Sequence, residues 1–142
     1  MAAFHTTSIS RLIVACAACA LLSTPALAQH FGGRWDTNQG VLRIDQDAYH
    51  VRGDYDFKGG RIVGEVEDNT LSGIWAQNYS DRRCFEERLG SHFWGRYRLH
   101  LAHDDEEFHG HWSYCDEGPR SGGDWDGKRL HREPWEHHRE HW

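Results

Sequence analysis

Residues 60–75 read GRIVGEVEDNTLSGIW, and this stretch decides the fold. Apolar residues or glycines alternate with polar residues on both sides of Asp68-Asn69, which is the period of a β-strand with one buried face. The Asp-Asn pair is typical of a tight turn. The stretch therefore predicts two consecutive antiparallel strands joined as a hairpin.

Glycine and tryptophan recur together along the chain. Four G-x-W tripeptides occur, at 33–35, 73–75, 110–112 and 123–125. Glycine normally weakens a strand, so its repetition beside tryptophan indicates close approach of two backbones, with an indole ring covering the gap. This pattern suits a small closed β-barrel better than an open sheet or a helix bundle.

The alternation of period two continues from Gly32 to Leu130, with short turn sequences between the runs. The runs amount to about eight strands, most of them joined by tight hairpins, and hairpin connections imply an antiparallel meander. Eight strands can close and leave an interior that side chains fill, or one just wide enough for a small ligand. The predicted fold is an all-β, antiparallel up-and-down β-barrel.

The first 28 residues have the layout of a secretory signal peptide. An apolar run at 12–22 precedes the small-residue site at 26–28, so cleavage is expected before Gln29. The run is too short to span a membrane. Lipid attachment at Cys16 is the alternative. We therefore expect a protein that is secreted or periplasmic.

Charge limits the partners of the remaining chain. The signal segment carries one arginine and no acid, which leaves 15 basic and 22 acidic residues and a net charge of −7. Nucleic acid and anionic membranes are poor partners for such a chain. We expect a monomer with a barrel domain at 29–130, no integral membrane span and a short His-rich tail at 131–142.

Two cysteines, Cys84 and Cys115, remain after signal removal. In an oxidising compartment they most simply form one disulfide, which closes a loop of about 30 residues. Cys84 lies in the longest connection of the chain, about 79–93, which is rich in charged residues. Long loops at the mouth of a barrel are frequent sites of binding specificity, and a purely structural stapled lid is the alternative.

Trp35 on the first strand and an inward-facing Arg129 on the last resemble the hallmark of lipocalins, fatty-acid-binding proteins and avidins, the calycin-type barrels. The resemblance implies that the arginine packs over the indole, as a cation–π contact, and closes the bottom of the barrel. The pattern in 60–75 is also similar to that of uncharacterised secreted bacterial proteins. The chain is shorter than typical lipocalins and has no clear set of polar residues that matches the biotin readers of avidins. A filled interior and a ligand pocket therefore both stay open.

The expected function is non-catalytic binding of a small apolar or aromatic ligand, in or at the mouth of the barrel. Trp75, Trp112 and Tyr97 face inward in the alternation and are the expected ligand-binding residues. No set of acid, base and nucleophile is recognisable, so we do not expect an enzyme. The alternative is a protein-interaction module, such as a periplasmic protease inhibitor, whose partner is an exported protein.

Histidines in the tail suggest a further alternative, which is binding of zinc or copper. If Pro134 begins a short helix, His137 and His141 share one face, with His138 beside them. The tail also fits the H-x-x-E-H motif of zinc proteases, but no scaffold could surround a motif so close to the last residue. A disordered polar tail is the simpler interpretation.

Overall fold

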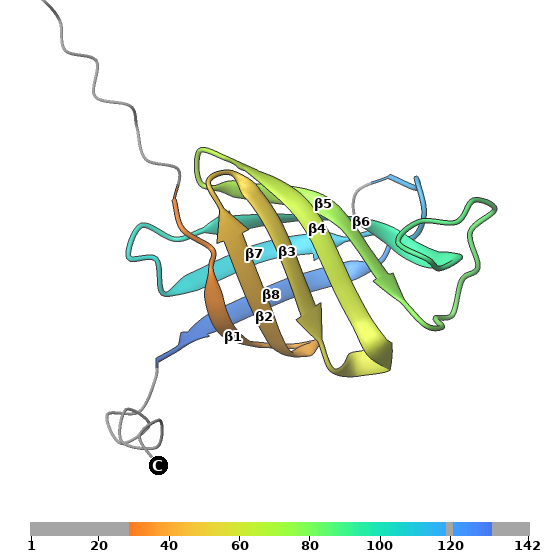
Figure 1. Cartoon of the computed structure of the whole chain (residues 1–142), viewed down its shortest axis with the longest axis horizontal. Helices are drawn as coiled ribbons and strands as arrows, with labels where there is room; N and C mark the ends of the chain where they lie inside the picture. The colour runs from red at the N-terminus through yellow and green to blue at the C-terminus, as the bar shows by residue number, and fades with distance from the viewer. Residues whose placement is uncertain (1–28, 119–120, 132–142) are drawn as a thin grey trace, which may run out of the picture.

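Eight antiparallel strands close into a barrel, in which each strand pairs with its neighbours in the sequence and β1 pairs with β8 (Figure 1). The structure is a computed structural model that describes residues 29–118 and 121–131. The strands are β1 (Gly33–Thr37), β2 (Gly40–Asp47), β3 (His50–Tyr55), β4 (Gly60–Glu67), β5 (Thr70–Gln77), β6 (Phe93–Leu101), β7 (Glu107–Trp112) and β8 (Gly123–Leu130), and a short 3-10 turn, η1 (Phe57–Gly59), precedes β4. The prediction of an all-β up-and-down barrel is confirmed.

Tight turns join most of the strands. The β2–β3 and β4–β5 turns contain Ala48 and Asp68, both with a φ of 53°, which is the left-handed backbone that two-residue hairpins require. Because consecutive strands are antiparallel, all odd-numbered strands run toward one end of the barrel, which we call the mouth. The long β5–β6 connection, residues 78–92, therefore lies at the mouth. The β2–β3, β4–β5 and β6–β7 turns lie at the opposite, closed end.

Inward-facing side chains fill most of the barrel. The largest fully buried ones inside it are Trp35, Trp125, Phe31, Phe108, Leu42, Ile62, Leu71 and Leu99. Rings meet edge to face, with centroids 5.0 Å apart for Trp35 and Phe108 and 5.6 Å apart for Tyr97 and Trp125. This geometry is the one that aromatic pairs prefer. Of the two alternatives left open by the sequence, the filled interior therefore describes most of the barrel.

Large inward rings lie directly opposite glycines on the neighbouring strand. The pairs are Tyr55 with Gly60, Trp75 with Gly95, Tyr97 with Gly73, Phe108 with Gly127, and Trp125 with Gly110. A Cβ atom on Gly60 or Gly127 would collide with the opposing ring, so these positions need glycine for space. The rings in turn cover the backbone that the glycines leave bare. Close backbone approach covered by a ring is the arrangement that the repeated G-x-W pattern predicts.

Arg129 closes the end of the barrel opposite the mouth. Its guanidinium carbon lies 4.2 Å from the centroid of a Trp35 ring, as the resemblance implies. The guanidinium also donates to the carbonyl oxygens of Gly32 (2.7 Å), His30 (2.8 Å) and Asp105 (2.8 Å). One side chain thus ties the segment before β1 to the β6–β7 turn.

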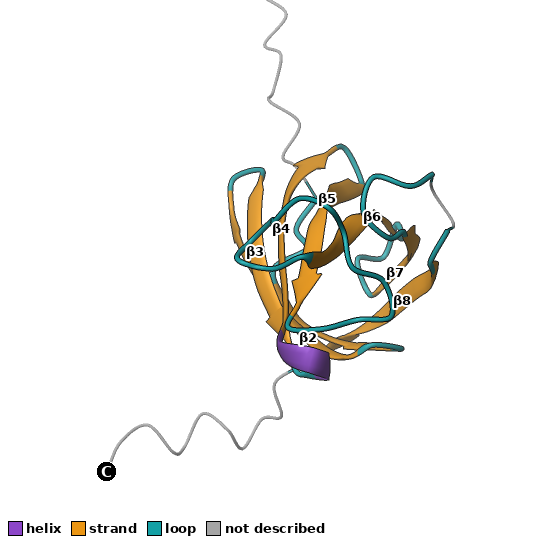
Figure 2. Cartoon of the chain, turned by 90° about the vertical axis from the view of Figure 1, so that its right-hand side faces the viewer, coloured by secondary structure: helices purple, strands orange, loops and turns teal. Residues whose placement is uncertain are grey.

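The predicted disulfide between Cys84 and Cys115 is present. It joins the β5–β6 loop to the segment that follows β7, and Figure 2 views the molecule from the side where this loop projects. Cys84 packs with Ala76 and Trp94 in a small apolar cluster on the outer wall, apart from the barrel interior. The loop is therefore fastened to the outside of the barrel next to its mouth.

Some predictions fall on residues that the structure does not describe. The expected signal peptide, 1–28, and the expected metal ligands of the tail, His137, His138 and His141, lie outside the described residues. Across residues 29–118 and 121–131, no helix has the length and apolar character needed to cross a membrane.

Candidate functional site

A cavity of about 170 Å³ opens at the mouth of the barrel, and we call it the mouth cavity. Its polar and charged wall comes from the β1–β2 turn, η1, the end of β5 and the start of the β5–β6 loop. Aromatic rings make up the rest of the wall: Tyr55, Phe57, Trp75, Trp112, Tyr114 and Trp125. Concave sites with apolar walls and a few polar groups are the usual form of small-molecule sites.

The rings around the mouth cavity hold one another in fixed orientations. The ring centroids of Trp75 and Trp112 are 5.6 Å apart at an interplanar angle of 90°, and those of Trp112 and Tyr114 are 4.9 Å apart at 86°. Tyr55 and Trp125 are 5.4 Å apart at 74°. Each contact is edge to face, so the wall presents both ring faces and ring edges to whatever enters.

Two hydrogen-bond donors of this wall have no acceptor within the described residues. The Gln77 amide donates to the Tyr55 hydroxyl (2.9 Å), which leaves the hydroxyl proton free to donate. The indole N–H groups of Trp75 and Trp125 donate to the Ser113 carbonyl (3.0 Å) and the Thr37 hydroxyl (3.3 Å). The Trp112 Nε1 atom is buried without such a partner. A buried donor without an acceptor is costly, and the Tyr55 hydroxyl is the one of the two for which a ligand in the cavity could supply an acceptor.

The Tyr55 hydroxyl is protonated at neutral pH, and burial extends the protonated range to higher pH. The side chain is 3% exposed, and removal from water raises its pKa from 10 to about 12, although the hydrogen bond from Gln77 acts in the opposite direction. Burial disfavours the charged phenolate, because that form loses its hydration. At neutral pH the hydroxyl is therefore a hydrogen-bond donor.

One cation stands at the rim of the mouth cavity. The Lys58 Nζ atom lies 4.9 Å from the centroid of Phe57 and 4.8 Å from that of Tyr79, which places it against two partly exposed rings. Within the described residues it forms no ion pair with a carboxylate at this rim. Asp81 also lines the cavity and supplies one negative charge. The rim therefore carries both signs of charge over an aromatic wall.

The structure brings together two of the three expected ligand-binding residues. Trp75 and Trp112 both line the mouth cavity, whereas Tyr97 is not among its lining residues. Tyr97 lies in the middle of β6, its ring covers Gly73, and its hydroxyl donates to the Val63 carbonyl (3.1 Å). Its role is therefore to fill the core.

The sequence prediction missed Tyr55, Tyr114, Gln77 and Lys58. Strand direction is the signal that could have found the first of them. In an up-and-down barrel the odd-numbered strands all end at the mouth, so inward residues at their ends must meet. Tyr55, Trp75 and Trp112 end or nearly end β3, β5 and β7, while Tyr97 is central in an even-numbered strand.

The β5–β6 loop contributes less to the mouth cavity than the sequence suggests. Ser80 and Asp81 line the cavity, whereas the part from Cys84 onward follows the outer wall. There Arg61 donates to the Leu89 carbonyl (2.8 Å), and the Trp94 indole donates to the Glu86 carbonyl (2.8 Å). The loop is therefore a wall of the site on one side and a brace for the barrel on the other.

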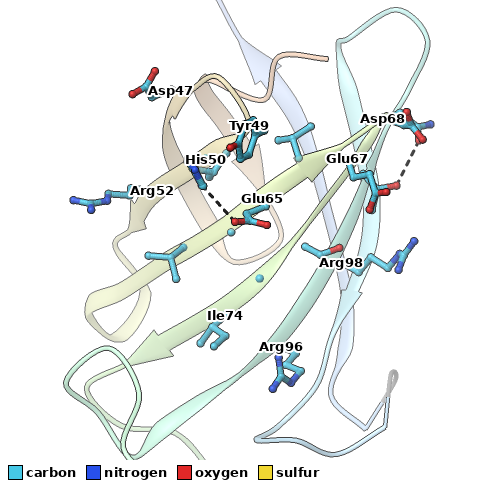
Figure 3. Close-up of a pocket in the computed structure, with 18 of the residues that line it drawn as sticks. Asp47, Tyr49, His50, Arg52, Glu65, Glu67, Asp68, Ile74, Arg96 and Arg98 are labelled. Atoms are coloured by element: carbon cyan, nitrogen blue, oxygen red, sulfur yellow. Dashed lines mark hydrogen bonds and ion pairs between the residues drawn. The ribbon is translucent and has the colours of Figure 1, made fainter. Parts of the chain in front are cut away.

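A larger groove of about 1430 Å³ runs over the outer face of β3–β6 (Figure 3). Val63 and Ile74 lie within it, and charged side chains stand around them. Figure 3 shows Arg52 and Arg98 pointing away from the groove on opposite sides. The ion pair between His50 and Glu65 (3.5 Å) is mostly exposed to solvent. Because its polar groups diverge, this groove lacks the convergent arrangement of the mouth cavity.

Metal ligands do not gather in the described part of the chain. Across residues 29–118 and 121–131, no group of three or more His, Cys, Asp or Glu side chains could hold a metal ion. The prediction of zinc or copper at the tail concerns residues outside that part and stays a prediction.

Comparison of the chain with protein-family models, with curated proteins and with solved structures gave no match. The eight-stranded antiparallel barrel and the contact of Arg129 with Trp35 are compatible with a calycin-like fold. Fold alone does not carry function, so function has to be argued from the mouth cavity.

Proposed function

We propose that this chain is an exported, non-catalytic binding protein whose mouth cavity holds one small aromatic ring. The observation that carries the proposal is a cavity of about 170 Å³ that opens at the mouth and is lined by six aromatic side chains together with five polar or charged ones. An apolar cavity of about 150 Å³ is enough to hold benzene. Sites for larger ligands usually exceed about 300 Å³, so a long lipid does not fit this one.

The donors at the wall define the substituent that the ring carries. Tyr55, which lines the cavity, offers a hydroxyl proton. A ring with an oxygen or nitrogen acceptor satisfies this donor, whereas a bare hydrocarbon leaves it unpaired. Lys58 at the rim adds attraction for a negatively charged substituent.

The proposal also includes export of the chain and a relation to calycin-type proteins. The disulfide between Cys84 and Cys115 is compatible with an oxidising compartment, and the expected signal peptide would deliver the chain there. The closed barrel with Arg129 over Trp35 supports a relation to calycin-type carriers. The simplest function for a barrel of this kind is to bind a ligand without catalysing a reaction.

A ligand panel tests the proposal. Benzyl alcohol and benzoate carry a ring and an acceptor, toluene lacks the acceptor, and cyclohexylmethanol lacks the flat ring. We expect the first two to change the intrinsic tryptophan fluorescence at lower concentration than the other two, because three tryptophans line the cavity. The absence of any response to the whole panel would contradict the proposal.

Variants of Trp112 locate the binding. Trp112→Phe keeps a ring but makes it smaller, so it should weaken benzyl alcohol binding about fivefold through lost ring contact. Trp112→Ala should weaken it more than about tenfold, because the wall itself is lost. Tyr97→Phe is the matched control, since Tyr97 does not line the cavity. Equal affinity of wild type and Trp112→Ala, measured by calorimetry, would place the site elsewhere.

A further inference from the structure

Phe85 is the most exposed large apolar residue in the described chain. It is 99% exposed, against 58% for the next one, Tyr79. The residues on both sides of Phe85 are nevertheless fixed. Cys84 is held by the disulfide and donates its N–H to the His92 carbonyl (2.7 Å), and the Glu86 carbonyl accepts from the Trp94 indole (2.8 Å).

The exposure of Phe85 is therefore a property of the fold. A phenyl ring held in water by a braced backbone loses little conformational freedom when it docks, and exposed aromatic anchors of this kind dominate the energy of many interfaces. A ring presented in this way needs an apolar receptor of about its own size.

We propose that Phe85 of one copy of this chain inserts into the mouth cavity of a second copy. The cavity of about 170 Å³ matches a single phenyl ring, and its wall offers edges and faces of other rings. The same β5–β6 loop that presents Phe85 contributes Ser80 and Asp81 to the cavity wall. Phe85 itself lies on the part of this loop that follows the outer wall next to the mouth. A two-fold axis beside the mouth therefore lets each copy insert its Phe85 into the cavity of the other.

Lys58 at the rim and the two carboxylates that follow Phe85 carry opposite charges, whereas Asp81 on the cavity wall has the same sign as those carboxylates. Glu86 and Glu87 are exposed, and their carboxylates lie 3.5 Å from Arg88 and 3.9 Å from His92 in the same copy. Lys58 lines the mouth cavity and has no carboxylate partner among the described residues. Insertion of Phe85 brings these carboxylates to the Lys58 of the other copy. Phe57 and Tyr79, which flank Lys58 and are 47% and 58% exposed, widen the apolar contact.

Insertion of Phe85 rests on the proposed function, since it uses the same mouth cavity, whichever small ligand that cavity holds. A small ring compound and Phe85 of a second copy compete for one space, so each should displace the other. Self-association would then couple the amount of dimer to the amount of ligand. The chain would be a dimer when empty and a monomer when filled, where the sequence suggests a monomer throughout.

Sedimentation velocity at increasing protein concentration tests the inference. We expect wild type to shift from monomer to dimer, and Phe85→Ala to need at least about thirtyfold more protein for the same shift, the effect expected for loss of a hot-spot anchor. Tyr49→Ala is the matched control, because Tyr49 is 53% exposed but lies in the β2–β3 turn at the closed end. It should behave as wild type.

Two further measurements separate the inference from the proposed function. Lys58→Glu should weaken the dimer, and Lys58→Glu combined with Glu86→Lys and Glu87→Lys should restore it. Benzyl alcohol should bind the Phe85→Ala monomer, because the cavity is unchanged, and should dissociate the wild-type dimer. Wild type that stays monomeric at all concentrations, or a dimer that persists in Phe85→Ala, overturns the inference whether or not benzyl alcohol binds.

Discussion

Both ends of the barrel are rich in aromatic side chains, but those at the closed end fill the core, whereas those at the mouth line a cavity. At the closed end, Trp35 and Phe31 are fully buried, and the Trp35 indole donates to the Phe31 carbonyl (2.8 Å). Arg129 there donates to three carbonyl oxygens. At the mouth, aromatic rings line a cavity, and the Trp112 indole has no acceptor within the described residues. Phe85, on the loop next to the mouth, is exposed to solvent.

The contrast separates stability from binding. At the closed end the Trp35 indole and the Arg129 guanidinium have acceptors, so these side chains hold the barrel together, although Gln29 Oε1 and Asp105 Oδ1 are buried there without a donor among the described residues. At the mouth, a rigid wall leaves an open cavity and donors without acceptors. A ligand or a partner that fills this cavity therefore makes contacts and hydrogen bonds that the fold itself does not make. We therefore expect substitutions at the closed end to change stability alone, and those at the mouth to change binding as well.

The largest effect is expected from Arg129→Ala. The change removes charge-assisted hydrogen bonds to Gly32, His30 and Asp105 together with the contact to Trp35, and should lower the free energy of unfolding by about 4 kcal/mol. Arg34→Ala is the control, because Arg34 points outward from β1 and should cost no more than about 0.5 kcal/mol. Urea denaturation measures the free energy of unfolding of both variants. Similar losses would contradict the expected difference between Arg129, which donates to three carbonyl oxygens, and the outward-facing Arg34.

The next largest effect is expected from the disulfide. Cys84 and Cys115 are 31 residues apart, and on the chain-entropy model a loop of that length stabilises by about 3–4 kcal/mol. The double variant Cys84→Ser/Cys115→Ser should lose that amount in urea denaturation. Ligand affinity should also fall, because Ser80 and Asp81 of the same loop line the mouth cavity. Unchanged affinity in the folded variant would show that the loop is only a brace.

A smaller effect is expected from Tyr55→Phe and from pH. The folded-state pKa of Tyr55 is raised above its unfolded value of 10 to about 12, so its contribution is complete below pH 10 and is lost as pH rises through 12. For wild type this loss is about 3 kcal/mol at most. Tyr55→Phe should flatten the fall of stability between pH 10 and 12. At neutral pH it should cost about 1 kcal/mol, for the lost bond from Gln77. An equally steep fall in the variant would assign the loss to other groups.

Much of the fold could be predicted from the sequence, because a barrel repeats one local rule. Alternation of period two sets which side chains of a strand share a face, and the β4–β5 hairpin around Asp68 follows that rule. The pairing of Cys84 with Cys115 follows from there being no other cysteine outside the expected signal segment. The contact of Arg129 with Trp35 followed from the resemblance to calycin-type barrels.

The alternation could not predict what covers the outer wall or how tightly the interior packs. Trp94 is on the outward phase of β6, yet it is 1% exposed because the β5–β6 loop lies over it. Tyr97 is on the inward phase but lies too deep in the barrel to line the mouth cavity. Both outcomes depend on contacts between residues distant in sequence, which a local pattern does not contain.

The most direct test of the two-ended account is a titration with benzyl alcohol followed through the indole N–H resonances in nitrogen-15 NMR spectra. The experiment reports on both ends of the barrel in one sample, and use of the Phe85→Ala variant removes the proposed competition by Phe85 of a second copy. The account predicts a large shift of the Trp112 resonance, smaller shifts for Trp75 and Trp125, and none for Trp35. An unmoved Trp112 resonance, or a Trp35 shift as large as that of Trp112, would contradict it.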